Sequence, residues 1–438
     1  MAFLRIPNSG NYWIKNAQIP ASLMVGGGFN LTKEGLCLVD IEIAQGMIAQ
    51  IVSAGNSAAS DTQMIDWRKG QVWPCFVDMH THLDKGHIWE RSPNPDNTFA
   101  SALETVKTDS QKYWQAEDVY RRMEFGIKCS YAHGTKAIRT HIDSFGEQAA
   151  ISLGAFKALQ QEWQNRVTLQ AVSLVTLDYY QTPEGVALAD RIAEIGGILG
   201  GVAYMHPDLD SQLDVVFSLA KERGLDLDFH TDETDEPNSI CLQKVAQAAL
   251  RNNFSGQIIC GHCCSLAVQT PEVVDKTLYL VKQAGIGIVS LPMCNLFLQD
   301  RKPKRTPRWR GVTILQELIQ YGISATVASD NCRDPFYGFG DHDVLEVFTQ
   351  AVRIAHLDMP YGDWPCAVTK TAADLINLPN AGRIGVGLPA DLILFKARNF
   401  SELLSRSQHD RIVIRNGQPI DTTLPDYAEL DDLVVKAM

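Results

Sequence analysis

Residues 74–85 have the sequence PCFVDMHTHLDK, and this stretch decides the fold. The apolar run that begins at Val72 predicts a buried β-strand, and His80 and His82 stand at its end. Side chains two residues apart on a strand face the same side, so both imidazoles can reach one point in space. Imidazole nitrogen is a ligand for zinc, iron and related divalent ions. Two ligands do not make a catalytic site, so the rest of the sequence has to supply more.

Three further apolar runs end in the same way. The run at 225–230, LDLDFH, ends at His230, and Glu233 follows three positions later. The runs QIICGH and ISATVASD end at His262 and Asp330. Each predicted strand therefore ends at a side chain that can bind a metal or carry a proton. Such side chains gather at the carboxyl ends of the strands in (β/α)8 barrels, which is the fold that we predict.

The order of these motifs resembles the amidohydrolase superfamily. Within it, the cytosine deaminase branch is similar in the motifs HTHLDK (80–85), RTHID (139–143), HTDE (230–233), NLFLQDR (295–301) and SDNCRDPF (329–336). The resemblance extends from about residue 65 to the end of the chain. It implies an α/β protein, a TIM barrel, that hydrolyses carbon–nitrogen bonds other than peptide bonds.

Short β-like runs at both ends of the chain surround a region in which β-like and helical patterns alternate. Such alternation is typical of a parallel barrel with helical crossovers. In the resembled family the two terminal segments join into one sheet structure. We therefore expect a β-sandwich of residues 1–70 and 386–438, and a catalytic barrel of residues 71–385.

The composition is that of an ordinary globular enzyme. The chain has 438 residues, of which 45% are hydrophobic, and a formal net charge of −12. This charge argues against nucleic acid or an anionic membrane as a partner. We found no membrane-span pattern and no signal-peptide pattern, and the ten irregularly spaced cysteines are typical of reduced thiols. We expect a cytoplasmic homo-oligomer that binds a small N-heterocyclic substrate.

The resemblance implies a metal centre. His80, His82, His230 and Asp330 would bind one divalent ion, Zn²⁺ or Fe²⁺, and His262 would hydrogen-bond to the water or to the developing oxyanion. An ion held by imidazoles and a carboxylate can lower the pKa of a bound water to roughly 7. A second ion would need a bridging lysine at the end of the fourth strand, and GILGGVAYM at 197–205 contains none.

The predicted reaction is hydrolytic deamination of an amino-substituted N-heterocycle, a cytosine-like pyrimidine or a related ring. Metal-bound hydroxide would attack the carbon of the C–N bond and release ammonia or an amine. The resemblance makes Glu233 the proton shuttle and Asp330 both ligand and base. Glu233 could instead be a solvated loop acid beside other acidic residues. The alternative function is hydrolytic opening of a cyclic amide or imide.

Substrate contacts are harder to predict. Lys85, Thr176, Asn331, Asp334 and Phe336 fall where the resembled family places pocket residues. Cytosine deaminases have a glutamine at the end of the third strand, whereas Thr176 falls near that place here. They also tend to have a second aspartate where this chain has Asn331. The ring should therefore be recognised differently, and the SDNCRD run (329–334) and the HTHLDK motif look closer to triazine aminohydrolases of the isopropylammelide type.

Five polar residues, one of them the Lys85 already named, have two possible roles each. Arg139, His141 and Asp143 alternate along the second strand and either support the pocket floor or contact the substrate. His206 follows the fourth strand and either faces the pocket or is a structural histidine. Lys85 could touch a substrate carbonyl or lie on the surface.

Overall fold

The structure is a computed structural model, and it describes residues 6–7, 10–57 and 63–435. The chain forms two compact units. The first comprises the described residues up to 77, together with 130–136 and 344–424. The second comprises 78–129, 137–343 and the described residues from 425 onward. All the residues of the predicted site belong to the second unit.

Parallel strands make up the centre of the second unit. They form a sheet of three strands and a sheet of five, in the orders β6-β7-β8 and β13-β12-β11-β10-β9. Their bounds are Phe76–Thr81 (β6), Thr135–Asp143 (β7), Thr168–Leu174 (β8), Leu199–Ala203 (β9), Leu227–Thr231 (β10), Ile258–His262 (β11), Gly287–Ser290 (β12) and Ala325–Val327 (β13). Every residue of β6, β10 and β11 is buried, including the polar side chains among them, because both faces of these parallel strands are covered.

The two sheets are connected at both of their edges. Isolated parallel bridges join Val172 to Ile198 and Thr176 to Val202, which links the end of β8 to β9. Another joins Thr81 to Asp330 and links β6 to the segment after β13. Links at both edges are what a (β/α)8 barrel requires.

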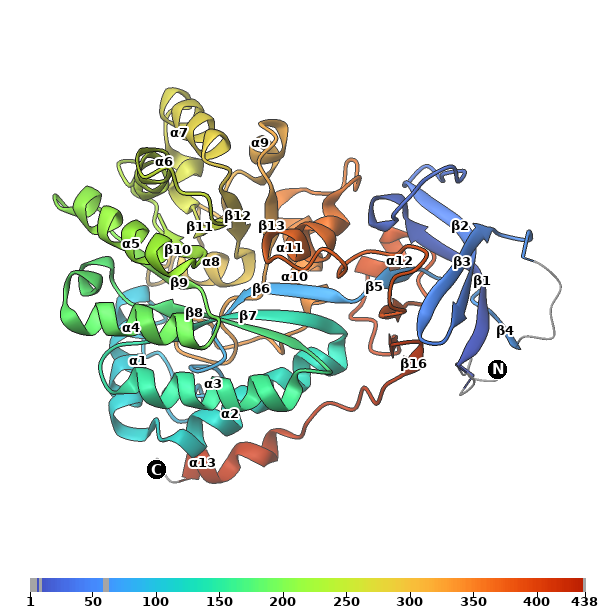
Figure 1. Cartoon of the computed structure of the whole chain (residues 1–438), viewed down its shortest axis with the longest axis horizontal. Helices are drawn as coiled ribbons and strands as arrows, with labels where there is room; N and C mark the ends of the chain where they lie inside the picture. The colour runs from blue at the N-terminus through green and yellow to red at the C-terminus, as the bar shows by residue number, and fades with distance from the viewer. Residues whose placement is uncertain (1–5, 8–9, 58–62, 436–438) are drawn as a thin grey trace. The chain divides into compact units, whose positions relative to one another are not determined.

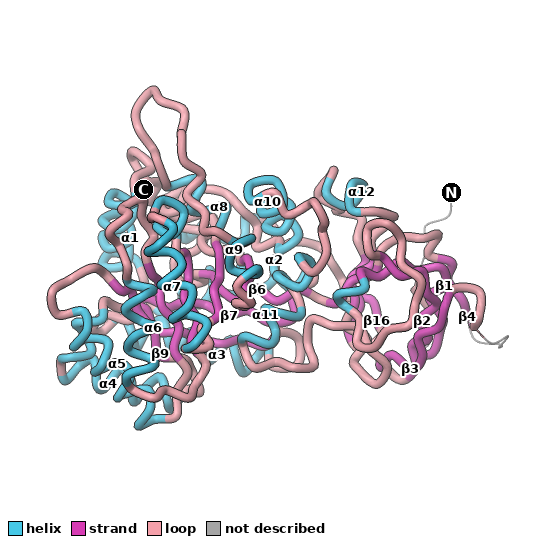
Figure 2. Tube along the Cα trace, turned by 90° about the horizontal axis from the view of Figure 1, so that it is seen from above, coloured by secondary structure: helices cyan, strands magenta, loops and turns pink. Residues whose placement is uncertain are grey.

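Helices flank these strands (Figures 1 and 2). Their bounds are Phe99–Tyr113 (α1), Ala116–His133 (α2), Gln148–Trp163 (α3), Pro183–Glu194 (α4), Leu209–Arg223 (α5), Cys241–Arg251 (α6), Pro271–Gln283 (α7), Pro292–Leu298 (α8), Leu315–Gln320 (α9) and Asp431–Val435 (α13). In α6 the buried residues include Leu242, Val245, Ala246 and Ala249, spaced as one helical face. The helices thus bury one side and leave the other in water.

The first unit contains two four-stranded sheets, in the orders β3-β2-β1-β4 and β16-β15-β14-β5. Their strands are Asn11–Pro20 (β1), Leu36–Ala44 (β2), Met47–Ser53 (β3), Gln63–Asp66 (β4), Val72–Pro74 (β5), Leu392–Leu394 (β14), Ile412–Arg415 (β15) and Gln418–Pro419 (β16). The unit also holds helices α10 (Val344–Ala355), α11 (Lys370–Leu375) and α12 (Phe400–Leu404).

The compact units differ from the predicted ranges in four places, of which two are short, because residues 71–77 and 130–136 group with the first unit, and two are longer. Residues 344–385 group with the first unit, where Phe348 of α10 packs edge-on against Trp73 with ring centroids 5.6 Å apart. Residues from 425 onward group with the second unit, because Leu430 and Leu433 share an apolar cluster with Phe125 of α2. Both longer differences reflect packing between segments far apart in sequence.

The apolar run that begins at Val72 forms two strands rather than one. At Cys75 the backbone N–H donates to the carbonyl of Asp391, and this interruption separates β5 from β6. Strand β5 pairs with β14 of the first unit, whereas β6 contains His80 and is followed directly by His82. All ten cysteines are free and buried, as their irregular spacing predicted. Within the described part of the chain, no helix is both long and apolar enough to cross a membrane.

Candidate active site

Histidines from four strands meet in the second unit. His80 comes from β6 and His82 directly follows it, while His141 comes from β7, His230 from β10 and His262 from β11. Asp330 follows β13, and its backbone N–H donates to the carbonyl of His80 at 2.9 Å. All six side chains are at most 7% exposed. The parallel strands bring together residues that are up to 250 positions apart, because their carboxyl ends meet at one edge.

The spacing of the donor atoms matches a metal centre. The Nε2 atoms of His82 and His230 are 3.3 Å apart, and His82 Nε2 lies 3.2 Å from Asp330 Oδ1. His80 Nε2 lies 3.7 Å from the same oxygen. Two nitrogens at about 2.0–2.1 Å from a tetrahedral ion are about 3.4 Å apart. These donors are therefore already close to the positions that a single ion requires.

The chemistry of the cluster also fits an ion. Both ring nitrogens of His80 and both carboxylate oxygens of Asp330 are buried without a hydrogen-bond partner among the described residues. Burial, followed by the neighbouring imidazoles, lowers the pKa of His80 and of His230 well below the ordinary value. Neutral imidazole is the form that binds metal. Buried polar groups normally have partners, so an ion is the expected partner here.

His141 belongs to the same cluster. Its ring centroid is 3.9 Å from that of His80 and 4.7 Å from that of His230, and its donor atoms group with theirs as a possible ligand set. The sequence indicated support of the pocket floor or contact with the substrate for His141, and not a metal ligand. The structure shows that His141 is within reach of an ion held by His80 and His230.

Glu233, Asn295 and His262 form a second group beside the first. The Nδ2 atom of Asn295 donates to Glu233 Oε1 at 2.9 Å and contacts His262 Nδ1 at 3.1 Å. An amide nitrogen can only donate, so His262 Nδ1 accepts and the proton of this ring lies on Nε2. His262 Nε2 has no partner among the described residues, although it is buried. His262 thus presents a free N–H donor.

Burial shifts the pKa values of this group in opposite directions. It lowers the pKa of His262 to about 4, so this ring is neutral at physiological pH. Burial and the charge of Asp330 raise the pKa of Glu233 well above its ordinary value, while the Asn295 hydrogen bond lowers it in part. A cation bound by Asp330 would offset the charge of Asp330, and burial would remain as the cause that raises the pKa of Glu233. Glu233 is therefore suited to hold a proton at a pH where an ordinary glutamate is ionised, and to release it during a reaction.

A cavity of about 820 Å³ opens over these residues. His82, His230, Glu233, His262 and Asp330 line it. Its remaining wall comes largely from one side of α1 along its whole length, the start of α3 and the strand ends, and includes Phe99, Leu103, Glu104, Lys107, Trp114, Phe145, Gln148, Tyr204 and Phe336. The volume lies in the upper part of the range of about 300–1,000 Å³ that is typical of ligand pockets.

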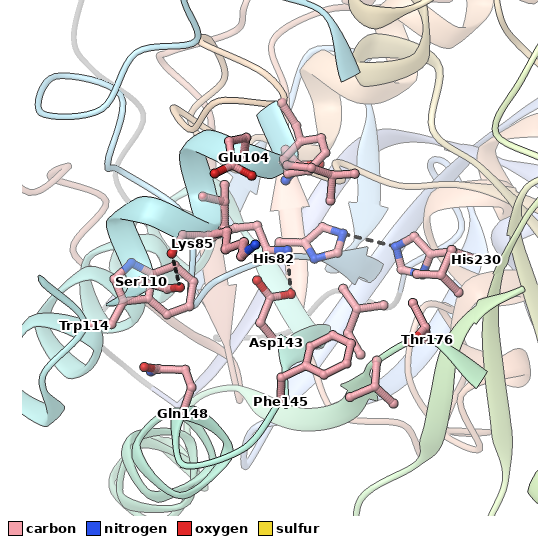
Figure 3. A pocket seen from close by; sticks show the side chains of 18 of the residues that line it. His82, Lys85, Glu104, Ser110, Trp114, Asp143, Phe145, Gln148, Thr176 and His230 are labelled. Atoms are coloured by element: carbon pink, nitrogen blue, oxygen red, sulfur yellow. Dashed lines mark hydrogen bonds and ion pairs between the residues drawn. The ribbon is translucent and has the colours of Figure 1, made fainter. Parts of the chain in front are cut away.

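An ion pair lies on the wall of this cavity, close to His82 (Figure 3). Lys85 Nζ donates to Asp143 Oδ1 at 2.7 Å, and its ammonium group lies 5.5 Å from the ring centroid of Phe336. Lys85 is 4% exposed, which rules out the surface position that the sequence left open. Burial is the largest single influence on the pKa of Lys85 and lowers it, but the charges of Asp143 and Asp84 and the hydrogen bond to Asp143 together raise the pKa above its ordinary value, so the lysine is charged. Asp143 also lines the cavity and is a pocket residue rather than a remote support.

The other predicted substrate contacts divide into two groups. Thr176, Asn331 and Phe336 line the cavity. Asp334 does not appear among the lining residues; it is fully buried behind Asn331 and accepts a hydrogen bond from Asn331 Nδ2 at 2.8 Å. Burial raises the pKa of Asp334 to about 7. Its contact is therefore with Asn331, which it orients.

Arg139 and His206 lie away from the cavity wall. Arg139 is 1% exposed, and its guanidinium donates to Asp228 at 2.9 Å and to Gln170 at 3.0 Å. Arg139 therefore supports the strands from inside, which is one of the two roles that the sequence left open for it. The side chain of His206 is 54% exposed and is not among the residues that line the cavity.

Sequence reasoning missed two parts of the site. Asn295 lay within a motif that carried the resemblance, but only the structure shows that it joins Glu233 to His262. Helix α1 was not predicted to border the cavity. Leu103 lines the cavity with an apolar side chain that is 47% exposed, but this exposure is visible only in the structure.

Comparison with known proteins identifies the family. The model of the amidohydrolase family matches residues 115–421. The chain belongs to the amidohydrolase family. It is thus a hydrolase of carbon–nitrogen bonds, as the motifs predicted.

The chain is 50% identical over 434 residues to a pterin deaminase of Rhizobium rhizogenes, covering 99% of both chains. It is 24% identical over 396 residues to N-isopropylammelide isopropyl amidohydrolase of a Pseudomonas species, covering 87% of this chain and 93% of the other. Among solved structures, 5-methylcytosine deaminase from Klebsiella pneumoniae is similar with a TM-score of 0.80 and 26% identity. That alignment covers 94% of this chain and 98% of the other.

Proposed function

We propose that this amidohydrolase deaminates pterin, a bicyclic ring that carries an amino group on its pyrimidine half, and that it does so on a (β/α)8 barrel with a terminal β-sandwich. The observation that carries the proposal is the 50% identity to a pterin deaminase over 99% of both chains. The cavity supports it, because a volume of about 820 Å³ has room for a second fused ring. The 26% identity to 5-methylcytosine deaminase supports the reaction class.

His80, His82, His230 and Asp330 would hold one divalent ion in this proposal, with His141 within reach of it. Such an ion lowers the pKa of a bound water to about 7, so that hydroxide is available at neutral pH. Asp330 would take the proton of the attacking water. The N–H of His262 would donate to the oxygen that gains negative charge as the attacked carbon becomes tetrahedral.

Glu233 would move the remaining protons. In its neutral form it would donate to the ring nitrogen beside the attacked carbon. The resulting carboxylate would take the hydroxyl proton, while Asp330 returns its proton to the amino group. The C–N bond then breaks, ammonia leaves and a carbonyl remains, and both side chains regain their starting states. Asn295 would keep Glu233 and His262 in place throughout.

Lys85 and Asp143 would recognise the ring by hydrogen bonds, in place of the glutamine that cytosine deaminases have and this chain lacks. A glutamine amide offers one donor and one acceptor, which match the carbonyl and the adjacent N–H of the pyrimidine half. The ammonium group of Lys85 and the carboxylate of Asp143, which lie 2.7 Å apart on the cavity wall, offer the same two functions. Apolar residues such as Phe336 and Phe145 would cover the faces of the ring.

The experiment that tests the proposal is single-substrate product analysis with metal-replete enzyme in ¹⁸O-labelled water. We expect one ammonia per pterin consumed, and a product that contains one labelled oxygen in place of the amino group. A ring-opened product, which the alternative reaction would give, or no turnover of pterin would contradict the proposal.

A further inference from the structure

A second group of metal-ligand side chains lies outside the catalytic cluster. His87, Cys332 and His342 each offer one donor atom, and these three atoms lie within 4.8 Å of one another. His87 belongs to the segment after β6, and the other two belong to the segment after β13. The reaction described above uses none of the three.

The three side chains are buried, at 7%, 1% and 2% exposed for His87, Cys332 and His342. Neither ring nitrogen of His87 has a hydrogen-bond partner among the described residues. A buried imidazole normally has at least one hydrogen-bond partner or ligand, so we expect the His87 ring to bind a group that is not a protein side chain. Burial, followed by the nearby His342, keeps the pKa of His87 well below its ordinary value, and the neutral ring is the metal-binding form.

The surroundings leave room for the donor atoms. Gly126 lies inside helix α2, where glycine weakens a helix relative to alanine. A Cβ at this position would lie 2.9 Å from His342 Nε2 and 2.9 Å from a methyl group of Leu83. The glycine thus allows the imidazole of His342 to approach the helix.

From these observations we infer that His87, Cys332 and His342 form a second, structural zinc site. A thiolate and two imidazoles are a ligand set that zinc prefers over magnesium or calcium. On a tetrahedral zinc ion the sulfur and a nitrogen are about 3.5 Å apart, so the donors need only small side-chain rotations from their present spacing. A water would complete the tetrahedral shell. The thiol proton is released to solvent when the ion binds.

Such an ion would fasten two segments that build the catalytic pocket. The backbone N–H of His87 already donates to the carbonyl of Cys332 at 3.2 Å, and that of Trp89 to Arg333 at 2.9 Å. The first segment carries Lys85, and the second carries Asn331. The ion would fix the positions of Lys85 and Asn331 relative to each other, and it would not contact the substrate.

Cobalt substitution tests the inference, because a cysteine thiolate gives Co²⁺ a charge-transfer absorption in the near ultraviolet that imidazole and carboxylate ligands do not give. The catalytic cluster contains no thiolate ligand in our assignment. We expect two metal ions per wild-type chain and a thiolate band in the cobalt-substituted protein. Cys332→Ser should halve the metal content and abolish the band, whereas His82→Ala should lose one ion and keep it.

The matched control is Cys294→Ser. Cys294 is also buried, and its Sγ lies 3.5 Å from Asn331 Oδ1, so it is the thiol to be excluded as a ligand of the catalytic ion. This variant should retain both ions and the band. One ion per wild-type chain, no thiolate band, or loss of the band in the Cys294 variant but not in the Cys332 variant would overturn the inference. The wild-type metal count and spectrum decide the question even if Cys332→Ser does not fold, and His87→Ala provides a second variant.

Discussion

Removing the amide of Asn295 should shift the pH dependence of catalysis. In Asn295→Ala, Glu233 loses the hydrogen bond of 2.9 Å that stabilises its carboxylate, and His262 loses the donor at 3.1 Å that keeps its proton on Nε2. The lost bond favoured the ionised form of Glu233, so the pKa of Glu233 should rise. Glu233 acts as an acid in the proposed first proton transfer, and its deprotonation should therefore set the alkaline limit of kcat/KM.

The size of the shift follows from the contact. A hydrogen bond to a charged group contributes about 1.5–3 kcal/mol when buried, and one pKa unit corresponds to about 1.36 kcal/mol. The Glu233 side chain is 15% exposed, so water can replace part of the lost bond. We expect the alkaline limit to move upward by about one pH unit. We also expect kcat/KM at neutral pH to fall at least about tenfold, because His262 is no longer held in one tautomer.

The assay is ammonia release from pterin, measured as kcat/KM across the pH range. Gln299→Ala is the matched control, because Gln299 lies one turn further on and donates at 3.1 Å to the backbone carbonyl of Glu233 rather than to its carboxylate. This control should keep the wild-type alkaline limit. An unchanged or lowered limit in Asn295→Ala, or an equal rise in Gln299→Ala, would refute the role assigned to Asn295.

Three other variants have defined expectations. Glu233→Gln should lose about 100- to 10,000-fold in turnover while keeping its metal content, and near-normal turnover would exclude it as the proton carrier. Asp330→Ala should lose one divalent ion by metal analysis and nearly all activity; retention of that ion would contradict its assignment as a ligand. Arg139→Met should lower the free energy of unfolding by about 3–5 kcal/mol, because it leaves the buried carboxylate of Asp228 unpaired. Burial raises the pKa of Asp228 to about 6 in the wild type. Losing Arg139 should raise the pKa of Asp228 further. When urea unfolding is measured at a pH below that pKa, Asp228 is protonated and the loss of stability caused by Arg139→Met should be smaller. A loss of stability that does not change with pH would argue against an unpaired Asp228 carboxylate as its cause.

The strand ends were predictable because a local pattern specifies them. The apolar runs that stop at His230 and His262 each form one buried strand in the structure, and the run that begins at Val72 forms two. Parallel pairing then brings the ends together whatever their distance along the chain. The resemblance to the amidohydrolases rested on the same residues, and the family match confirms it.

Contacts made by loops and helices could not be predicted in this way. The group of His87, Cys332 and His342 spans more than 250 positions and follows no spacing rule. The break at Cys75 depends on pairing of β5 with the distant β14. Likewise, the pairing of Lys85 with Asp143 joins the ends of two strands by side-chain geometry alone, which an amino-acid pattern does not contain.

The most direct test of the central claim is the ratio of kcat/KM for pterin to kcat/KM for cytosine, measured side by side on metal-replete enzyme. The cavity of about 820 Å³ and the absence of the glutamine at Thr176 lead us to expect a strong preference for the bicyclic ring. Hydrogen-bond mismatches in buried sites cost several kcal/mol, so the ratio should exceed about 100. A cytosine efficiency above about 10,000 M⁻¹s⁻¹, equal to or greater than that for pterin, would contradict the account.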